Sequence, residues 1–145
     1  MSPPSGPLRI GWKERLDFPE WGLKRVRVKV DTGARTSALD AVGYDLVEGA
    51  GGLVARLRID LRRRRAGRIK EVETPVVCMT VVRNTGGIRE CRPVVEALVK
   101  LGPVTRRIRL TIASRAGMRY RMILGREALA GAFVVDVSQK YLLGS

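Results

Sequence analysis

The stretch VRVKVDTGARTSAL, residues 26–39, decides how the rest of this 145-residue sequence is interpreted. Its three valines alternate with basic residues, a pattern that predicts a β-strand with one face in the core. The strand then delivers a carboxylate, a hydroxyl and a glycine in consecutive positions, at Asp31, Thr32 and Gly33. A carboxylate at the end of a strand suits a catalytic site, although Asp and Gly are also common in ordinary turns. The junction therefore has two interpretations, an active-site loop and a plain strand-to-turn connection.

The Asp31 motif resembles the active-site loop of retropepsin-like aspartic proteases, whose signature is a hydrophobic residue followed by Asp-Thr-Gly-Ala. The longer string KVDTGARTSAL is similar to a bacterial retropepsin-like family that is also labelled as ATP-dependent zinc proteases. Some members of that family sit beside RimK-type glutamate ligases and trim the glutamate tails that those ligases add. Further along, ILGREAL at residues 123–129 resembles the hydrophobic-hydrophobic-Gly element of the same fold and the short helix after it. The resemblance implies that Gly125 lets an Asp loop pass close by. Two separate motifs in the expected order favour the active-site interpretation.

The resemblance implies an all-β fold, a retropepsin-like (acid protease) barrel with a flap hairpin and one short C-terminal helix. The sequence itself favours this class, because it shows short alternating strands, glycine turns and no sustained helical periodicity. Residues 1–8 are rich in proline and predict a flexible N-terminal tail. Residues 9–145 predict a single retropepsin-like domain.

A glycine-tipped hairpin over residues 79–92 corresponds, by the resemblance, to the flap that closes a retropepsin cleft. Its tip is Asn-Thr-Gly-Gly at 84–87, and the resemblance places Gly86 and Gly87 over a bound substrate. The alternative is an ordinary surface hairpin, since a glycine-rich turn between two β-prone runs predicts only the hairpin.

The two cysteines, Cys78 and Cys91, both fall in or beside this hairpin. A turn centred between Thr85 and Gly86 would place Cys91 opposite Thr80 and leave Cys78 a diagonal step away. That separation is too large for a disulfide. We expect both thiols to be reduced and to serve as buried apolar fillers.

A second hairpin is predicted around the arginine-rich segment 62–68, which we interpret as a solvated turn. The strand before it, residues 53–61, alternates and should direct Asp60 outward. The returning strand, 71–74, should be interrupted at Pro75, because proline is tolerated only at sheet edges and bulges.

The composition is strongly basic, with a net charge of +14 from 28 Lys and Arg against 14 Asp and Glu. Such a field attracts anionic partners, and nucleic acid, an anionic membrane and an acidic peptide all fit. No apolar run approaches the roughly 18 residues that a transmembrane helix needs. The N-terminus shows no signal-peptide pattern, so we expect a cytoplasmic protein without a membrane partner.

Histidine is absent, which excludes HExxH zinc sites and every histidine-based catalytic triad. With two cysteines and no CxxC, a structural zinc would need mostly carboxylate ligands, which is unusual. We therefore expect no metal and no cofactor, despite the zinc in the family label.

Peptide hydrolysis by the retropepsin class needs two carboxylates that share one proton. The chain has a single Asp-Thr-Gly, and Asp136 in Val-Val-Asp-Val lacks the Thr-Gly that should follow it. A two-fold homodimer solves the problem, because an isologous interface brings Asp31 and its mate to the axis. By the resemblance, Thr32 would link the two loops by hydrogen bonds and Gly33 would present its carbonyl to substrate.

The sequence departs from viral retropepsins after the motif, where they have an acidic residue that pairs with the Arg of the Gly-Arg element. Here that position is Arg35, which would repel Arg126, so Glu127 or a substrate carboxylate must take one of the two. We interpret both arginines as candidates for holding an acidic substrate, and a structural pairing of Arg126 with Glu127 or Asp40 is the alternative. The expected substrate-binding residues are Ala34, Arg35, Gly86, Gly87, Arg115, Arg119, Arg121 and Arg126.

Together these observations predict a homodimeric aspartic peptidase that hydrolyses acidic, glutamate-rich peptide tails, with a glutamate-tailed ribosomal protein as one candidate substrate. Its partners would be a second copy of the chain and the acidic peptide, with ribosome association left open. One rival is a retropepsin-like domain that binds peptide without cutting it. The other is a basic β-barrel that binds RNA or the ribosome. Against RNA stands an aromatic content of 5%, because single-stranded bases are recognised largely by stacking.

Overall fold

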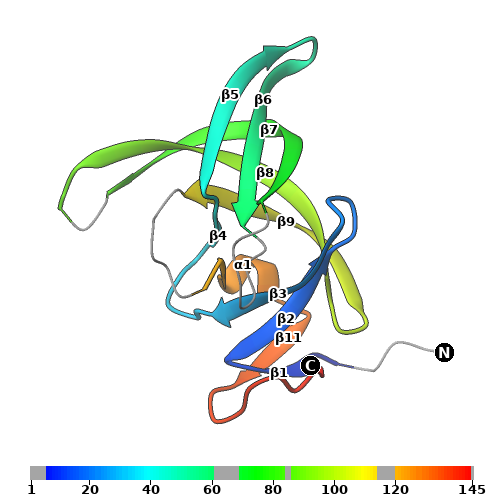
Figure 1. The fold of residues 1–145 in the computed structure, drawn as a ribbon. Helices are drawn as coiled ribbons and strands as arrows, with labels where there is room; N and C mark the ends of the chain where they lie inside the picture. Colours follow the sequence, from blue (N-terminus) through cyan, green and yellow to red (C-terminus); the bar gives the residue numbers. More distant parts are fainter. Residues whose placement is uncertain (1–5, 61–68, 84–85, 114–119, 145) are drawn as a thin grey trace.

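A computed structural model describes residues 6–60, 69–83, 86–113 and 120–144, which form β-strands and one short helix (Figure 1). The elements are β1 (Leu8–Gly11), β2 (Lys13–Phe18), β3 (Leu23–Val30), β4 (Ser37–Asp40), β5 (Gly43–Gly49), β6 (Gly52–Asp60), β7 (Ile69–Arg83), β8 (Arg89–Leu101), β9 (Val104–Ala113), β10 (Met122–Leu124), α1 (Arg126–Leu129) and β11 (Phe133–Asp136). The expected tail falls largely outside the described residues, and Leu8 pairs with Phe133.

The main sheet closes on itself to form a small mixed barrel. Its strand order is β2-β3-β10-β4-β9-β8, and a pairing between β2 and β8 completes the ring. Strand β10 lies between β3, to which it is parallel, and β4, to which it is antiparallel. Beyond β8 the sheet continues through β7, β6 and β5, and Figure 1 shows these strands projecting from the barrel as two long arms. The predicted all-β barrel with one short helix is therefore confirmed.

The barrel interior is filled by the alternating apolar residues that the sequence pattern predicts. Strand β3 buries Val28 and Val30 and exposes the basic residues between them, as expected for a strand with one face in the core. The largest fully buried side chains include Leu16, Phe18, Leu23, Leu39, Leu110, Ile112, Met122 and Leu124. These residues come from five of the six strands of the ring, and β8 adds Val95 and Val99, so the barrel has one continuous core.

Strand β7 runs through Pro75 without stopping, contrary to the prediction of an interruption. It is 15 residues long and pairs with β6 as far as Pro75, then with β8 from Val76 onward. A bulge between Val76 and Cys78 accompanies the exchange. Proline lacks a backbone donor, and here it stands where the strand changes partners.

The hairpin of β7 and β8 is present, but its predicted register is wrong by one residue. Cys91 lies opposite Val81, and Thr80 lies opposite Arg92. Both cysteines are unbonded, as expected, yet they are exposed rather than buried. The reason is that the outer part of this hairpin projects beyond the barrel, where neither of its faces meets the core (Figure 1).

Asp60 also departs from its prediction, since it is buried instead of facing solvent. Arg121 provides the compensation, with its Nη2 3.2 Å from an Asp60 oxygen and its Nη1 3.6 Å from an oxygen of buried Asp40. A guanidinium between two carboxylates satisfies charges that would be costly to bury alone. The arginine-rich turn 62–68 that follows Asp60 lies outside the described residues.

The only helix within the described ranges, α1, has four residues, so no helix described here is long enough to cross a bilayer.

A buried glutamate fastens the C-terminal segment to the barrel. Glu14 is a charged residue, yet it is fully buried, because it stands on the inward face of β2 among apolar side chains. Its carboxylate accepts hydrogen bonds from the backbone N–H groups of Gly11 at 2.7 Å, Leu142 at 2.9 Å and Leu143 at 3.3 Å. Three amide donors satisfy the carboxylate and tie both ends of the chain to one strand.

Replacing Glu14 should therefore weaken the fold. Glu14→Ala leaves three backbone donors without their acceptor, and we expect it to lower the free energy of unfolding by about 3 kcal/mol. The matched control is Glu48→Ala on exposed β5, which should change it by less than about 0.5 kcal/mol. Urea unfolding followed by tryptophan fluorescence measures both. Equal stability of the two variants would show that the glutamate does not fasten the C-terminal segment.

Candidate active site

The Asp31 loop begins directly after β3 and is folded by its own backbone. The Asp31 N–H donates to the Leu124 carbonyl at 2.9 Å, which continues the pairing of β3 with β10. The Gly33 N–H donates to Asp31 Oδ1 at 3.0 Å, and the Ala34 N–H donates to the Asp31 carbonyl at 3.1 Å. Asp31 is half-buried, whereas Thr32 and Gly33 are exposed. The carboxylate is thus held at a fixed place and is accessible to solvent.

The far side of the loop is held by the start of α1. The Arg126 N–H donates to the Ala34 carbonyl at 2.8 Å, and the Glu127 N–H donates to the Arg35 carbonyl at 3.0 Å. One residue earlier, the Gly125 N–H donates to the hydroxyl of buried Ser37 at 3.0 Å. The N–H groups at the start of the short helix, which have no partner within the helix, therefore donate to the loop and not to solvent.

Glycine is required at position 125 because this segment passes very close to the backbone of Thr36. A Cβ added there would lie 2.4 Å from the Thr36 carbonyl oxygen and 2.6 Å from its carbon. The Gly125 φ of −91° is open to any residue, so backbone freedom is not the reason for glycine. The sequence motif predicted this close passage of an Asp loop past the glycine, and the structure confirms it.

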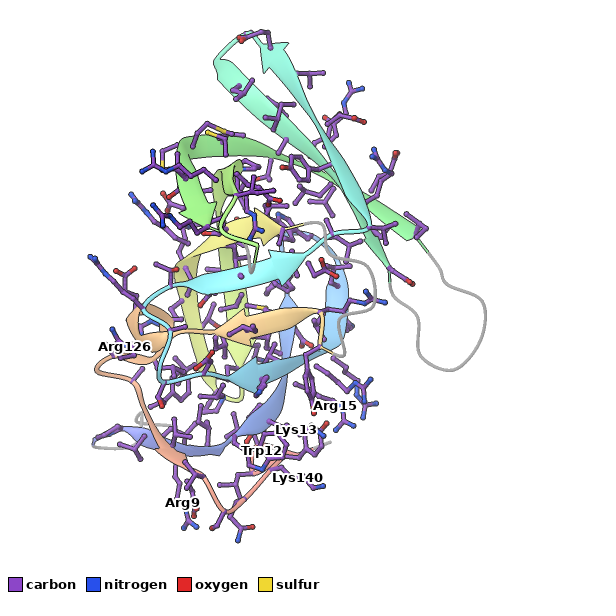
Figure 2. All side chains as sticks on the ribbon, turned by 90° about the vertical axis from the view of Figure 1, so that its left-hand side faces the viewer. Arg9, Trp12, Lys13, Arg15, Arg126 and Lys140 are labelled. Atoms are coloured by element: carbon purple, nitrogen blue, oxygen red, sulfur yellow. The ribbon has the colours of Figure 1, made fainter. Side chains whose placement is uncertain are left out.

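The Arg126 side chain is hydrogen-bonded to the exposed turn of the Asp31 loop. Its Nη1 donates to the carbonyls of Thr32 at 3.0 Å and Gly33 at 3.2 Å, and Figure 2 shows its side chain at the edge of the barrel. The predicted alternative, a pairing of Arg126 with Glu127 or Asp40, is wrong. Glu127 instead takes Arg35, whose Nε lies 2.9 Å from Glu127 Oε1. A non-local backbone target of this kind leaves no signal in the sequence.

The other predicted substrate-binding residues do not all gather at this loop. Arg121 is engaged by Asp40 and Asp60, as described above. Gly86 and Gly87 are exposed at the end of the β7–β8 hairpin. Arg115 and Arg119 lie outside the described residues.

Asp136, which the sequence argues against as a second catalytic carboxylate, is held in a structural network. It accepts hydrogen bonds from the hydroxyl and the N–H of Ser138, at 2.6 and 3.0 Å, and it pairs with Arg9 on β1. The Ser138 hydroxyl, the Ser138 N–H and then the Arg9 guanidinium lower the pKa of Asp136 to about 2. This carboxylate joins β11 to β1 and is not part of the Asp31 loop.

Sequence reasoning missed one residue that builds the site, Ser37, and one that stabilises the barrel, Glu14. Ser37 stands within the quoted motif but was given no role, although its hydroxyl accepts the Gly125 N–H. Glu14 had a usable signal, since a glutamate at an inward position of an alternating strand demands partners. Among the described residues, no three Cys, Asp or Glu side chains are grouped so as to hold a metal ion.

A barrel that presents an Asp-Thr-Gly loop against a hydrophobic-Gly strand and a short helix has the architecture of a retropepsin-like domain. Residues 9–144 match the family described as "RimB-like: Retropepsin-like aspartic endopeptidase RimB", and the chain belongs to this family.

Curated relatives contain this domain as part of longer chains. The chain is 33% identical over 140 residues to a "Probable alpha-L-glutamate ligase" of Desulfotalea psychrophila, covering 93% of this chain and 29% of the relative. It is 34% identical over 137 residues to a protein of the same name from Parasynechococcus marenigrum, again covering 93% and 29%. The chain therefore spans about three tenths of the length of the curated relatives it matches.

The fold also matches a crystal structure from Legionella pneumophila, of a protein of unknown function (DUF785). The TM-score is 0.74 at 24% sequence identity, over 94% of this chain and 98% of that one. This likeness bears on the fold alone.

The closeness at Gly125 makes a direct prediction. Gly125→Ala should lower the free energy of unfolding by about 2–3 kcal/mol, because the new methyl group meets rigid backbone and the loop must move. Gly51→Ala is the matched control: nothing lies within 4 Å of its added Cβ, and the change should stay within about 0.5 kcal/mol. Thermal and urea unfolding measure both. A Gly125→Ala variant as stable as the control would mean that the loop is not clamped there.

Proposed function

We propose that this chain is a homodimeric aspartic endopeptidase that hydrolyses acidic, glutamate-rich peptide tails, with Asp31 of each subunit forming the catalytic dyad. The observation that carries the proposal is the Asp31 loop, whose backbone is fixed by β10 on one side and by α1 on the other. Fixing the backbone places the carboxylate before substrate arrives, which is how positioned groups lower a reaction barrier.

The chemistry requires a pair of carboxylates at one site. One Asp31, ionised, takes a proton from the attacking water, while its protonated mate donates a hydrogen bond to the scissile carbonyl. The water oxygen forms a bond to the carbonyl carbon. The tetrahedral intermediate then collapses by breaking the C–N bond, and the proton taken from the water passes to the leaving amine. Two carboxylates this close cannot both be charged, so they share a single proton.

The second carboxylate comes from the second subunit in this proposal. Asp31 is the chain's single Asp-Thr-Gly aspartate, and Asp136 is committed to Ser138 and Arg9. An isologous contact between two Asp31 loops would bring the exposed Thr32 hydroxyls near the axis, where each loop can steady the other.

The acidic substrate is supported by charge and by relatives. The net charge of +14 attracts polyanions, and Arg35 is an exposed arginine next to the loop. The curated relatives carry the name of probable alpha-L-glutamate ligases, so a peptidase domain in the same chain would meet glutamate-containing products. A glutamate-tailed ribosomal protein in the cytoplasm fits this description. Arg115, Arg119 and Arg126, with Gly86 and Gly87 at the end of the β7–β8 hairpin, remain candidates for holding it, whereas Arg121 is already held by Asp40 and Asp60.

The decisive variant is Asp31→Asn. It should reduce hydrolysis of a glutamate-tailed peptide by at least about a thousandfold, because the dyad then lacks the group that moves the proton. Mass spectrometry of the products measures the rate, and an unchanged melting temperature and dimer mass show that the fold is intact. Asp45→Asn, an exposed carboxylate on β5, is the control and should cut normally.

Near-normal cleavage by a clean Asp31→Asn preparation would contradict the assignment of the nucleophile-activating group. The same assay should be repeated with EDTA. Loss of activity in EDTA that zinc restores would indicate a metal mechanism in place of the dyad. If neither form cuts but both bind the peptide, the domain is a binding module.

A further inference from the structure

A row of basic side chains lies on the outer face of β2 and β3. Lys13 lies directly opposite Lys29 in the sheet, and Arg15 lies directly opposite Arg27. All four point away from the core, because the residues between them on both strands face inward. We call these four residues the basic ladder.

The basic ladder is electrostatically unfavourable by itself. Like charges directly opposite one another in a sheet destabilise it. All 14 acidic residues belong to the described segments, and within those segments none forms an ion pair with any of the four ladder residues. Exposed arginines elsewhere do have such partners, for example Arg56 with Glu73 and Arg107 with Glu20. The ladder is therefore a site of uncompensated positive charge.

Aromatic rings hold the two β2 cations in place. The Lys13 ammonium lies 5.1, 5.2 and 5.8 Å from the ring centres of Trp12, Tyr120 and Tyr141. The Arg15 guanidinium lies 4.2 Å over the ring of Tyr141. Figure 2 shows Trp12, Lys13 and Arg15 gathered at one end of the molecule, away from Arg126. These contacts order the cations without neutralising them.

The same contacts favour a peptide over a nucleic acid as the occupant. Single-stranded nucleic acid is bound by stacking bases on open aromatic faces. Here the Tyr141 ring already carries Arg15 and Lys13, so it offers no open platform on that side. What the surface presents is an array of cations, which carboxylates satisfy.

The spacing of the basic ladder suits an extended acidic peptide. Its two opposed pairs, Lys13 with Lys29 and Arg15 with Arg27, are separated by two residues along each strand, which is about 7 Å. An extended peptide presents alternate side chains on one face at the same interval of about 7 Å. Glutamates at alternate positions of a tail would therefore contact the two basic pairs in succession.

The basic ladder also leads along β3 toward the Asp31 loop. Lys29 is two residues before Asp31, and the Val30 N–H donates to the Trp12 carbonyl at 2.8 Å, beside Lys13. We propose that the basic ladder is a second binding site, which holds the acidic stretch of the substrate beyond the residues in the cleft. This inference rests on the proposed preference for acidic peptides, but binding to the ladder is measured without cleavage.

The test uses Asp31→Asn protein and a fluorescent peptide that ends in a run of glutamates. The double variant Arg27→Gln/Lys29→Gln changes two exposed side chains that make no ring contact. The control, Arg56→Gln/Arg107→Gln, removes the same charge from two ion-paired positions elsewhere. We expect the Kd for the peptide to rise about tenfold in the ladder variant and less than about twofold in the control. In protein with Asp31 intact, the ladder variant should lose kcat/KM on long tails and keep it on short peptides.

Equal weakening by both double variants would overturn the proposal, because only the overall field would then matter. A single-stranded RNA oligonucleotide that binds more tightly than the peptide, and depends on the same residues, would also overturn it. If the protein cuts no peptide but the binding result holds, the peptidase proposal fails and the ladder site stands. If cleavage is normal and the ladder variant binds and cuts long tails like the unaltered protein, the reverse is true.

Discussion

The close passage of Gly125 past Thr36 is the constraint on which the rest of the structure depends. It lets β10 and α1 reach the Asp31 loop from opposite sides, so the loop is bonded through Asp31 and Leu124 on one side and through Ala34 and Arg126 on the other. The barrel supplies the rigidity for this contact, because β3 and β4, which bound the loop, both pair with β10. The position of the Asp31 carboxylate is therefore set by the closed sheet and not by the loop alone.

Arginine is used in this chain for two separate purposes. Some arginines satisfy buried or terminal groups: Arg121 serves Asp40 and Asp60, and Arg106 donates to the carbonyls of Ala128 and Ala130 at the end of α1. The basic ladder has no such partner within the described residues. A net charge of +14 does not distinguish these uses, and only the placement of each side chain shows which charges are available to a ligand.

Much of the fold could be predicted from the sequence, because the strands alternate clearly. Short motifs also mark both the Asp31 loop and the segment of β10 and α1 that holds it. The alternation around Val28 fixed the β3 face, and Ile123-Leu124-Gly125 indicated the close passage. What failed depended on non-local geometry. The register of the β7–β8 hairpin turns on the number of residues in its loop, which a glycine-rich string does not specify. The target of Arg126 is backbone more than 90 positions away in sequence, which no pattern encodes.

The most direct test of the account is the activity of a mixed dimer with one unaltered subunit and one Asp31→Asn subunit, isolated by sequential affinity steps on two different tags. If the site is a shared dyad, the mixed dimer should hydrolyse a glutamate-tailed peptide no faster than the double Asp31→Asn dimer, because neither half holds both carboxylates. A mixed dimer with about half the activity of the unaltered dimer would contradict the account, because each subunit would then carry out the reaction with its own Asp31 alone.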